Sequence, residues 1–217
     1  MIPTWNAAAT IRKTLDSLGS NIDAFVVDAR STDETAELAA QHGAKVLLSE
    51  RGRGIQLALG ATAAGDSWLL FLHADTLLDK GWLEHATVFM SAPGNQGKAA
   101  VFRFSLDDLG VFPRCLELLV SLRSRWLAAP YGDQGLLIHR HLYDAIGGYK
   151  SIPLMEDVDI VRRLGRRRLV HLGAVAITSA WRYQRTGYLR RSVVNLSCLL
   201  LYFCGAPMKL IVRLYGP

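Results

Sequence analysis

The alternation of short apolar runs with helix-like segments constrains the fold of this chain more than any other feature. Apolar runs of four or five residues, the length of buried strands, occur at 25–28, 45–48 and 68–72. Between the runs lie predicted helices, one of which places Ile11, Leu15 and Leu18 on a single face. This order predicts an α/β fold with a doubly wound, mostly parallel sheet flanked by helices.

The sequence also indicates where several helices begin and end. "STDE" at 31–34 has the spacing of a capping box, so we predict that a helix begins there and runs to Gly43. Residues 156–165 carry acids in the first predicted turn and arginines near the end, which suits the helix dipole. At the start, "MIPTWN" leaves so few residues before Pro3 that the first strand is very short or the chain begins late.

The later part of the chain continues as an α/β protein. The patterns predict strands at 99–106, 135–140 and 174–177, and helices at 54–63, 82–90 and 113–127. The chain has 217 residues, half of them hydrophobic, and shows no repeats or low-complexity tracts. We therefore expect a single domain with a substantial core.

Positive charge is concentrated in the C-terminal third. Residues 1–138 hold 12 Lys/Arg and 15 Asp/Glu (−3), whereas residues 139–217 hold 13 and 4 (+9). This imbalance favours an anionic partner. No nucleic-acid-binding motif accompanies the positive charge, so the favoured partners are a phosphorylated substrate and a membrane surface. The apolar segment 193–206 is shorter than the roughly 20 residues that a spanning helix needs. Two interpretations stay open: a packing helix, or an interfacial helix on anionic lipid helped by Arg190 and Arg191.

The cysteines bear on the compartment. Cys115, Cys198 and Cys204 have neither metal-site nor disulfide spacing, and no secretory signal precedes them. We interpret them as buried thiols of a cytoplasmic protein. The interfacial interpretation of the C-terminal segment would place that protein peripherally at the inner face of the membrane.

Polar side chains follow the apolar run at 68–72. "FLHADT" places His73 and Asp75 directly after that run, two residues apart. In α/β sheets, ligands bind at the carboxyl ends of the strands. Side chains two residues apart on an extended segment point the same way, so we expect both to face one ligand site.

A glycine-containing stretch, "ERGRGIQLALG", follows a predicted strand and opens a helix. It does not fit a dinucleotide-binding motif, because the third glycine position holds Leu57, and no Gly-Lys-Ser/Thr follows for a P-loop. Arg51 and Arg53 remain of interest because a helix N-terminus is a natural place for phosphate. Two solvated arginines are the alternative.

Four motifs occur in order along the chain: "PTWN" (3–6), "VVDARSTDET" (26–35), "FLHADT" (71–76) and "MEDVD" (155–159). Together they resemble the family 2 glycosyltransferases of the GT-A fold. Three segments look especially like those of one subgroup, the short, single-domain bacterial transferases associated with radical-SAM or selenium-related gene clusters. They are "GRGIQLALGA", "LLFLHADT" and "TSAWRY". The resemblance covers nearly the whole chain. It implies a metal-dependent inverting enzyme that moves a sugar from a nucleoside diphosphate sugar to a hydroxyl acceptor.

The resemblance also implies a division of the chain and roles on the donor side. A nucleotide-binding half is expected over about 1–106, an acceptor half over about 107–186, and C-terminal helices over about 187–214. Asp28 would accept a hydrogen bond from the nucleotide base, and Pro3 and Trp5 would form a wall beside it. His73 would contact ribose or phosphate, or assist the metal if that is Mn²⁺. Arg53 joins the nucleotide-binding candidates through its place at a helix N-terminus.

On the reaction side, the resemblance implies that Asp75 binds Mg²⁺ or Mn²⁺ on the donor diphosphate, a mode in which one protein carboxylate suffices. Asp157 would be the general base, with Glu156 orienting the acceptor or sharing that role. Further implied contacts are Asp133 and Gln134 to the acceptor, and Arg182 or Arg185 to the leaving diphosphate.

This chain departs from the family pattern at Ala7, Ala29 and His73, where many relatives have other residues, and these departures motivate a second hypothesis. The chain would then be a catalytically silent nucleotide-binding or membrane-associated protein. A sugar nucleotidyltransferase is a third hypothesis, but "PTWNAAAT" lacks the glycine and lysine of the usual signature loop.

Overall fold

The computed structural model describes residues 1–65, 67–126 and 132–216. Three parallel strands, in the order β1-β2-β3, form one sheet: β1 (Ile2–Thr4), β2 (Phe25–Asp28) and β3 (Lys45–Leu48). They alternate with the helices α1 (Ala8–Leu18), α2 (Thr35–Gln41) and α3 (Arg53–Ala63). The alternation expected from the sequence is confirmed, including a first strand of only three residues.

The second sheet is mixed and has the order β4-β7-β6-β8-β5. Its strands are β4 (Trp68–Phe71), β5 (Thr76–Leu78), β6 (Ala99–Leu106), β7 (Leu136–His139) and β8 (Leu169–Thr178). β6 and β8 are parallel, whereas β4–β7, β6–β7 and β5–β8 are antiparallel. Met1 joins the two sheets, because its nitrogen donates to the Leu70 carbonyl (2.6 Å) and its carbonyl accepts from the Leu72 N–H (3.1 Å).

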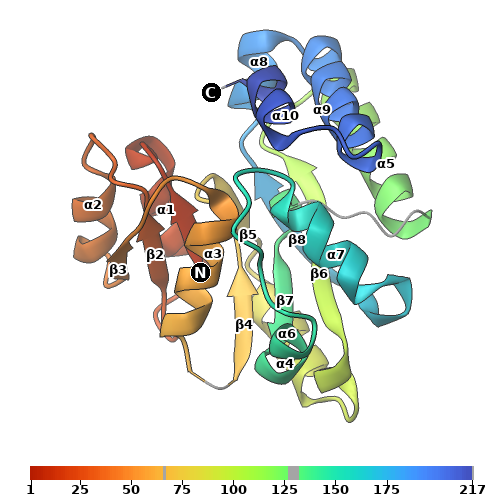
Figure 1. The fold of residues 1–217 in the computed structure, drawn as a ribbon. Coiled ribbons are helices and arrows are strands. Elements are labelled where there is room, and N and C mark those ends of the chain that lie inside the picture. Colours follow the sequence, from red (N-terminus) through yellow and green to blue (C-terminus); the bar gives the residue numbers. More distant parts are fainter. Residues whose placement is uncertain (66, 127–131, 217) are drawn as a thin grey trace.

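Helices cover the second sheet and extend beyond it (Figure 1). They are α4 (Trp82–Ser91), α5 (Val111–Trp126), α6 (Arg140–Ala145), α7 (Glu156–Leu164), α8 (Trp181–Thr186), α9 (Tyr188–Phe203) and α10 (Met208–Tyr215). Short 3₁₀ turns lie at Asn95–Gly97, Gly132–Gln134 and Arg166–Arg168. The predicted fold class is confirmed, with a C-terminal group of helices set apart above the sheets. The predicted end of α5 at residue 127 lies outside the described residues.

The α1 helix shows how the pattern becomes packing. Ile11, Leu15 and Leu18 are buried on one face, as predicted, and join a core with Val26 and Phe102. A second core cluster lies under α3, α6 and α7, around Leu69, Phe71 and Ile138. These two clusters hold the strand ends in fixed positions.

The capping-box prediction at 31–34 is wrong. α2 begins at Thr35, and its N-cap residue makes no side-chain capping bond. Instead, the Asp33 carboxylate accepts from the Ala8 N–H of α1 (3.1 Å), and the Thr35 hydroxyl accepts from the Ala7 N–H (2.8 Å). Asp33 and Thr35 therefore cap the neighbouring helix, because α1 and α2 start at the same edge of the sheet, and Asp33 also accepts from the Thr35 N–H at the start of α2 (3.1 Å).

The C-terminal helices pack on the start of α7. Cys198 of α9 and Ile211 of α10 are buried with Leu154, Met155 and Val158. The prediction that all cysteines are buried is wrong for Cys115 and Cys204, which are exposed. Among the described residues, no helix has both the length and the apolar character needed to cross a bilayer.

Candidate functional site

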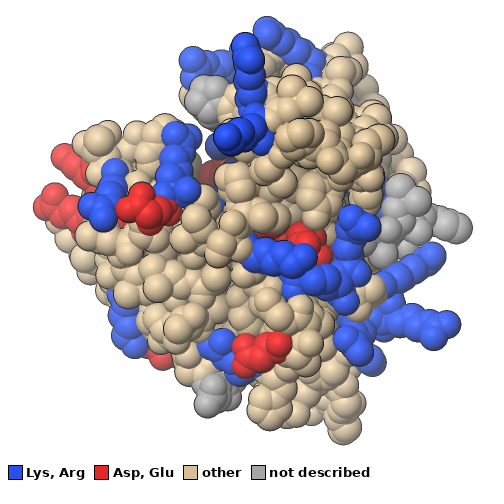
Figure 2. Space-filling view, in the orientation of Figure 1, with Lys and Arg blue, Asp and Glu red and all other residues tan. Residues whose placement is uncertain are grey.

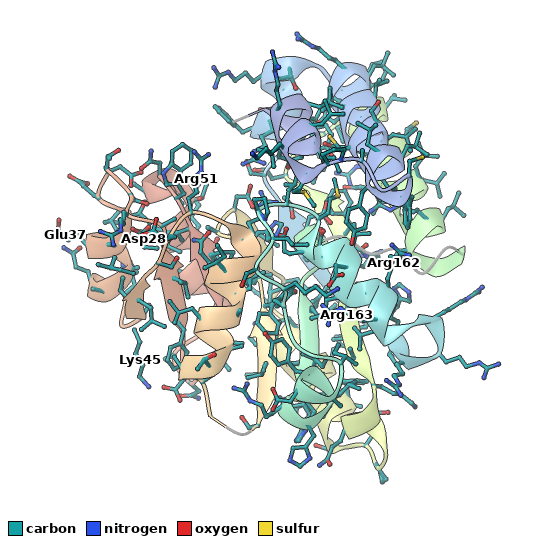
Figure 3. All side chains as sticks on the ribbon, in the orientation of Figure 1. Asp28, Glu37, Lys45, Arg51, Arg162 and Arg163 are labelled. Carbon is teal, nitrogen blue, oxygen red and sulfur yellow. The ribbon has the colours of Figure 1, made fainter. Side chains whose placement is uncertain are left out.

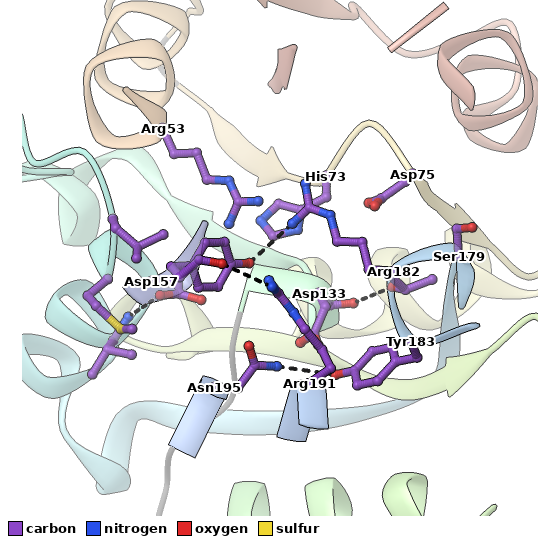
Figure 4. Close-up of a pocket in the computed structure, with 15 residues that line it drawn as sticks. Arg53, His73, Asp75, Asp133, Asp157, Ser179, Arg182, Tyr183, Arg191 and Asn195 are labelled. Atoms are coloured by element: carbon purple, nitrogen blue, oxygen red, sulfur yellow. Dashed lines mark hydrogen bonds between the residues drawn. The ribbon is translucent and has the colours of Figure 1, made fainter. Parts of the chain in front are cut away.

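A cavity of about 110 Å³ lies between the ends of the strands and the C-terminal helices (Figure 4). His73 and Asp75 reach it from the turn after β4, and Thr178 and Ser179 from the end of β8. Both residues of the His-Ala-Asp segment therefore face one cavity, as the sequence predicted. Six charged side chains line it: Arg53, Asp75, Asp133, Asp157, Arg182 and Arg191.

These six charges are not paired with one another. Within the described residues, no Lys or Arg forms an ion pair with Asp75, Asp133 or Asp157, and none of the three arginines pairs with a carboxylate. Cations and anions that share a cavity without ion pairs keep their hydrogen-bonding capacity for other groups. The cavity is thus suited to a ligand that carries both phosphate and hydroxyl groups.

Asp157 is held in a fixed orientation. Its Oδ2 accepts from the Gly132 N–H and its Oδ1 from the Val158 N–H, both at 2.7 Å. Glycine at position 132 leaves room for the His73 ring, because a Cβ there would lie 2.5 Å from its Nε2 and would displace it. The turn at Gly132, the histidine and the aspartate therefore depend on one another's positions.

Glu156 does not line the 110 Å³ cavity. It is 1% exposed and lies in a smaller, mostly apolar space, which His73 and Asp157 also line, and neither of its carboxylate oxygens has a hydrogen-bond partner. Burial, with a smaller contribution from Asp157, raises its pKa to about 8. Glu156 is therefore neutral at pH 7, and the predicted acceptor contact does not match its position.

The turn at 132–134 contributes one of its two predicted residues. Asp133 lines the cavity, and its Oδ1 is buried with no hydrogen-bond partner. Burial raises the pKa of Asp133 to about 6; Arg123 opposes the rise, and the Asp157 and Asp75 carboxylates add to it. Gln134 instead turns into the core, where its Nε2 donates to the Phe102 carbonyl (3.0 Å).

His73 lies among cations. Burial lowers its pKa well below the ordinary value, and the positive charges of Arg53 and Arg182 lower it further. The imidazole is therefore neutral near pH 7. A neutral ring can donate or accept one hydrogen bond to a ligand without adding charge to the site.

The residues predicted to hold the nucleotide base lie in the lobe of β1–β3, outside this cavity (Figure 3). Asp28 is 1% exposed and accepts hydrogen bonds from the Thr4 hydroxyl and from the N–H and hydroxyl of Ser31. Pro3 is buried in β1. Trp5 is 41% exposed, and the Arg51 guanidinium stacks 3.5 Å from the centre of its ring.

The loops beside these residues are conformationally unusual. Asn6 (φ 50°) follows β1 and Arg30 (φ 55°) follows β2, and both have the left-handed backbone that non-glycine residues seldom adopt. Hydrogen bonds fix the pair of loops, since the Asn6 N–H donates to Ser31 and its side-chain oxygen accepts from the Thr32 N–H. Such strain, held in place by surrounding bonds, concentrates at functional sites.

Arg53 is placed by a close contact between α3 and the loop before α7. The N–H of Gly54 donates to the Ile152 carbonyl (3.3 Å), and a Cβ at this position would lie 2.1 Å from the carbonyl oxygen of Lys150. The glycines of "GRG" therefore serve helix–loop packing. This contact ties the arginine at the start of α3 to the segment that leads to Asp157.

Only one of the two arginines predicted near the C-terminal helices lines the cavity. Arg182 does, and it donates to the Tyr215 hydroxyl (3.1 Å), whereas Arg185 lies near the Trp181 ring and is not part of the cavity lining. Sequence reasoning missed Arg191, which donates to the Tyr215 carbonyl (3.1 Å) and lies 4.2 Å from that ring. It also missed Tyr183, Asn195 and Tyr215. Tyr183 ends the "TSAWRY" motif, whereas no motif signals Arg191, Asn195 or Tyr215.

The carboxylates of this cavity fit a divalent metal only when a bound phosphate group supplies further oxygen ligands. Among the described residues, no group of three or more His, Cys, Asp or Glu side chains is placed to hold a metal ion. Asp75 and the unpartnered Asp133 oxygen lie in the same cavity, and Asp75 contributes to the raised pKa of Asp133. One or two carboxylates, completed by phosphate oxygens and water, are a normal coordination for Mg²⁺.

Comparison with known proteins gives a consistent assignment. The sequence model of one family, described as Glycosyl transferase family 2, matches residues 1–153. An uncharacterized glycosyltransferase of Mycobacterium tuberculosis is 34% identical over 82 residues, which are 37% of this chain and 38% of that protein. One from Rickettsia felis is 32% identical over 107 residues, 48% of this chain and 38% of that protein. The matches thus span well under half of these relatives.

Solved glycosyltransferases share the fold. S. aureus TarS 1-349 in complex with UDP has a TM-score of 0.63 at 17% identity, and the match covers 99% of this chain and 68% of that one. The mannosyltransferase PcManGT from Pyrobaculum calidifontis, in complex with GDP-Man and Mn²⁺, has a TM-score of 0.62 at 21% identity, covering 87% and 60%.

Proposed function

The chain belongs to glycosyl transferase family 2, and we propose that it acts as a metal-dependent inverting glycosyltransferase. It would transfer a sugar from a nucleoside diphosphate sugar to a hydroxyl acceptor. The observation that carries this proposal is the single cavity in which Asp157, Asp75 and three arginines converge without ion pairs. A base, a metal-binding carboxylate and cations for a diphosphate are the groups that such a reaction needs.

Asp157 is the proposed general base. Two backbone N–H groups hold its carboxylate in one orientation, so little reorganisation is needed when it accepts a proton. The acceptor hydroxyl gives its proton to Asp157 as its oxygen bonds to the anomeric carbon. The bond from that carbon to the diphosphate oxygen breaks on the opposite face, and the nucleoside diphosphate leaves with the electron pair.

On the donor side, Asp75 would hold Mg²⁺ or Mn²⁺, which neutralises the charge that develops on the leaving diphosphate. Arg53 and Arg182 reach the same cavity and would bind the phosphate oxygens directly. Neutral His73 lies beside them and would donate one hydrogen bond to phosphate or ribose.

We propose that the nucleotide base binds over the strained loops of the β1–β3 lobe. The exposed Trp5–Arg51 stack offers a flat surface there, and the buried Pro3 supports it from the strand β1 that precedes the loop. Asp28 already accepts three hydrogen bonds, so its main role would be to shape the loop. A carboxylate has about four acceptor positions, which leaves one for the base.

The test compares Asp157→Asn with Asp16→Asn, a substitution at an exposed aspartate of α1. Removing the base is expected to lower kcat by about 10²–10⁴-fold and to leave nucleotide binding intact. Binding is read from thermal unfolding with UDP, GDP, CDP, ADP or dTDP, each with and without Mn²⁺. A ligand at about 100 times its Kd stabilises by roughly 2.7 kcal/mol. Full activity of Asp157→Asn would refute the base assignment, and pyrophosphate in place of nucleoside diphosphate would indicate nucleotidyl transfer.

We propose that residues 1–217 act as one transferase domain, with a nucleotide half over about 1–106, an acceptor half over about 107–186 and helices over about 187–214. The proposed place of action is the cytoplasm, with peripheral contact at the inner face of the membrane. We also propose that the chain is one of the short bacterial transferases associated with radical-SAM or selenium-related genes.

A further inference from the structure

The α9 helix presents an apolar stripe to solvent along its whole length. The stripe consists of residues spaced by four and three, each 51–73% exposed: Leu189, Val193, Leu196, Leu200 and Phe203. The opposite side of the helix carries Arg191, Asn195 and Cys198, which face the cavity or the buried cluster. This reverses the usual surface helix, in which the apolar face packs inward. Apart from Phe203, whose ring lies 5.1 Å from the Arg162 guanidinium, the outer face of α9 therefore packs against no other element within the described residues.

The neighbouring α5 helix shows the same pattern. Val111, Leu118 and Leu122 are 46–75% exposed and follow the same helical spacing, with Phe112 and Leu119 exposed beside them. The Phe112 ring stacks on Tyr188 with centroids 6.3 Å apart, so the two helices begin next to each other. Scattered exposed leucines are ordinary, but matching stripes on adjacent helices indicate an interaction surface.

The charge around these stripes selects the partner. From residue 160 to the end, the chain has eleven Lys/Arg and no Asp or Glu. Exposed cations of this group lie on the helices that carry or adjoin the α9 stripe, at Arg185, Arg190, Lys209 and Arg213. Figure 2 shows uncharged surface over the C-terminal helices, with Lys and Arg along its upper edge. Apolar side chains bordered by cations are the pattern of a surface that rests on an anionic bilayer.

We propose that the outer faces of α5 and α9, here called the docking face, bind an anionic lipid bilayer. The apolar stripes enter the headgroup region, and the four cations contact lipid phosphates. This proposal specifies which surface makes the peripheral membrane contact proposed above. The surface includes α5, which the sequence did not indicate as membrane-binding. It does not depend on the transfer chemistry. The cavity lies on the inner side of α9, so docking sets it one helix diameter, about 10 Å, from the lipid.

A second copy of this chain is the rival occupant, and charge argues against it. Two docking faces brought together would place two sets of the same four cations near each other. The acids beside α5, Asp108 and Glu117, already bind Tyr188 and Arg114, and α9 and α10 carry no acid to compensate. Like charges at an apolar interface oppose association. A bilayer with anionic headgroups has the opposite sign and meets no such cost.

The experiment is vesicle flotation of the full chain. It compares phosphatidylcholine vesicles with vesicles that also contain phosphatidylglycerol, at low and high salt. We expect flotation only with the anionic vesicles and weaker flotation at high salt, since exposed charges are screened. Leu196→Ser combined with Leu200→Ser should reduce the bound fraction at least tenfold. Val88→Ser, which changes an apolar residue on α4 that is at least as exposed as Leu196 and Leu200, should not change it.

Two further measurements separate the outcomes. The fold of each variant is checked by its melting temperature, which should change little because all three side chains are exposed. Light scattering after gel filtration detects a dimer. A dimer that the double variant abolishes, without flotation, would overturn the proposal, and so would equal flotation of wild type and double variant. Flotation without any nucleotide-dependent thermal shift would refute the proposed function and leave the docking face intact.

Discussion

Replacing Glu156 by glutamine is expected to change how stability depends on pH. The Glu156 carboxyl is 1% exposed, has no hydrogen-bond partner, and has a pKa of about 8 instead of its ordinary 4.5. Between these two values the unfolded chain has lost this proton and the folded chain still holds it. Each rise of one pH unit in that window therefore lowers the free energy of unfolding of the wild type by about 1.4 kcal/mol. From about pH 6 to pH 8, Glu156→Gln should gain about 2 kcal/mol relative to wild type.

The assay is urea unfolding of both proteins at intervals from about pH 5.5 to pH 9, because the difference between them cancels most other titrating groups. Glu84→Gln, at an exposed glutamate of α4, controls for the removal of one glutamate. A difference between wild type and Glu156→Gln that stays constant across the range would refute the reasoning. It would mean that Glu156 finds a partner or solvent in the folded protein.

Three further substitutions test the packing and the cavity. Gly54→Ala should lower the free energy of unfolding by more than about 2 kcal/mol, because its Cβ would meet a backbone carbonyl. Gly97→Ala is the control, because a Cβ at position 97 meets open space. Equal melting temperatures of the two variants would contradict this prediction. Asp33→Ala should cost about 1 kcal/mol through loss of the α1 cap, measured by urea unfolding, and no loss would show that the cap is dispensable. Arg182→Gln should reduce kcat about 10²-fold and Arg185→Gln less than about twofold; similar effects of the two would place the diphosphate elsewhere.

Much of the fold follows from local patterns. The strands β2, β3 and β4 are short apolar runs between helices, so their positions and the α/β class were predictable. The antiparallel pairing of β4 with β7 was not, because it joins residues that are about 70 positions apart and leaves no local signal. The capping box failed for a similar reason, since Asp33 caps α1, a helix that precedes it by 25 residues.

The site was predictable where the chain's topology dictates it. His73 and Asp75 follow the strand β4, and strand ends in α/β sheets meet at one edge. Glu156 and Asp157 differ by about 100° around the start of α7, so tertiary packing decides which one faces the cavity. Arg191 and Tyr215 carry no motif and come from helices whose orientation depends on a small cluster with α7. Their place in the cavity required the three-dimensional structure.

The contact at Gly54 has a consequence for recombining this chain with its relatives. The family match ends at residue 153, which makes that position an obvious crossover point for chimeric enzymes. A crossover there would give the carbonyls at Lys150 and Ile152 to one parent and Asp157 to the other, while Gly54 stays with the first. The Gly54 contact survives this crossover, but Gly132, whose N–H holds the Asp157 carboxylate, is then separated from Asp157, so a viable exchange has to take Gly132 and the Asp157 turn from the same parent.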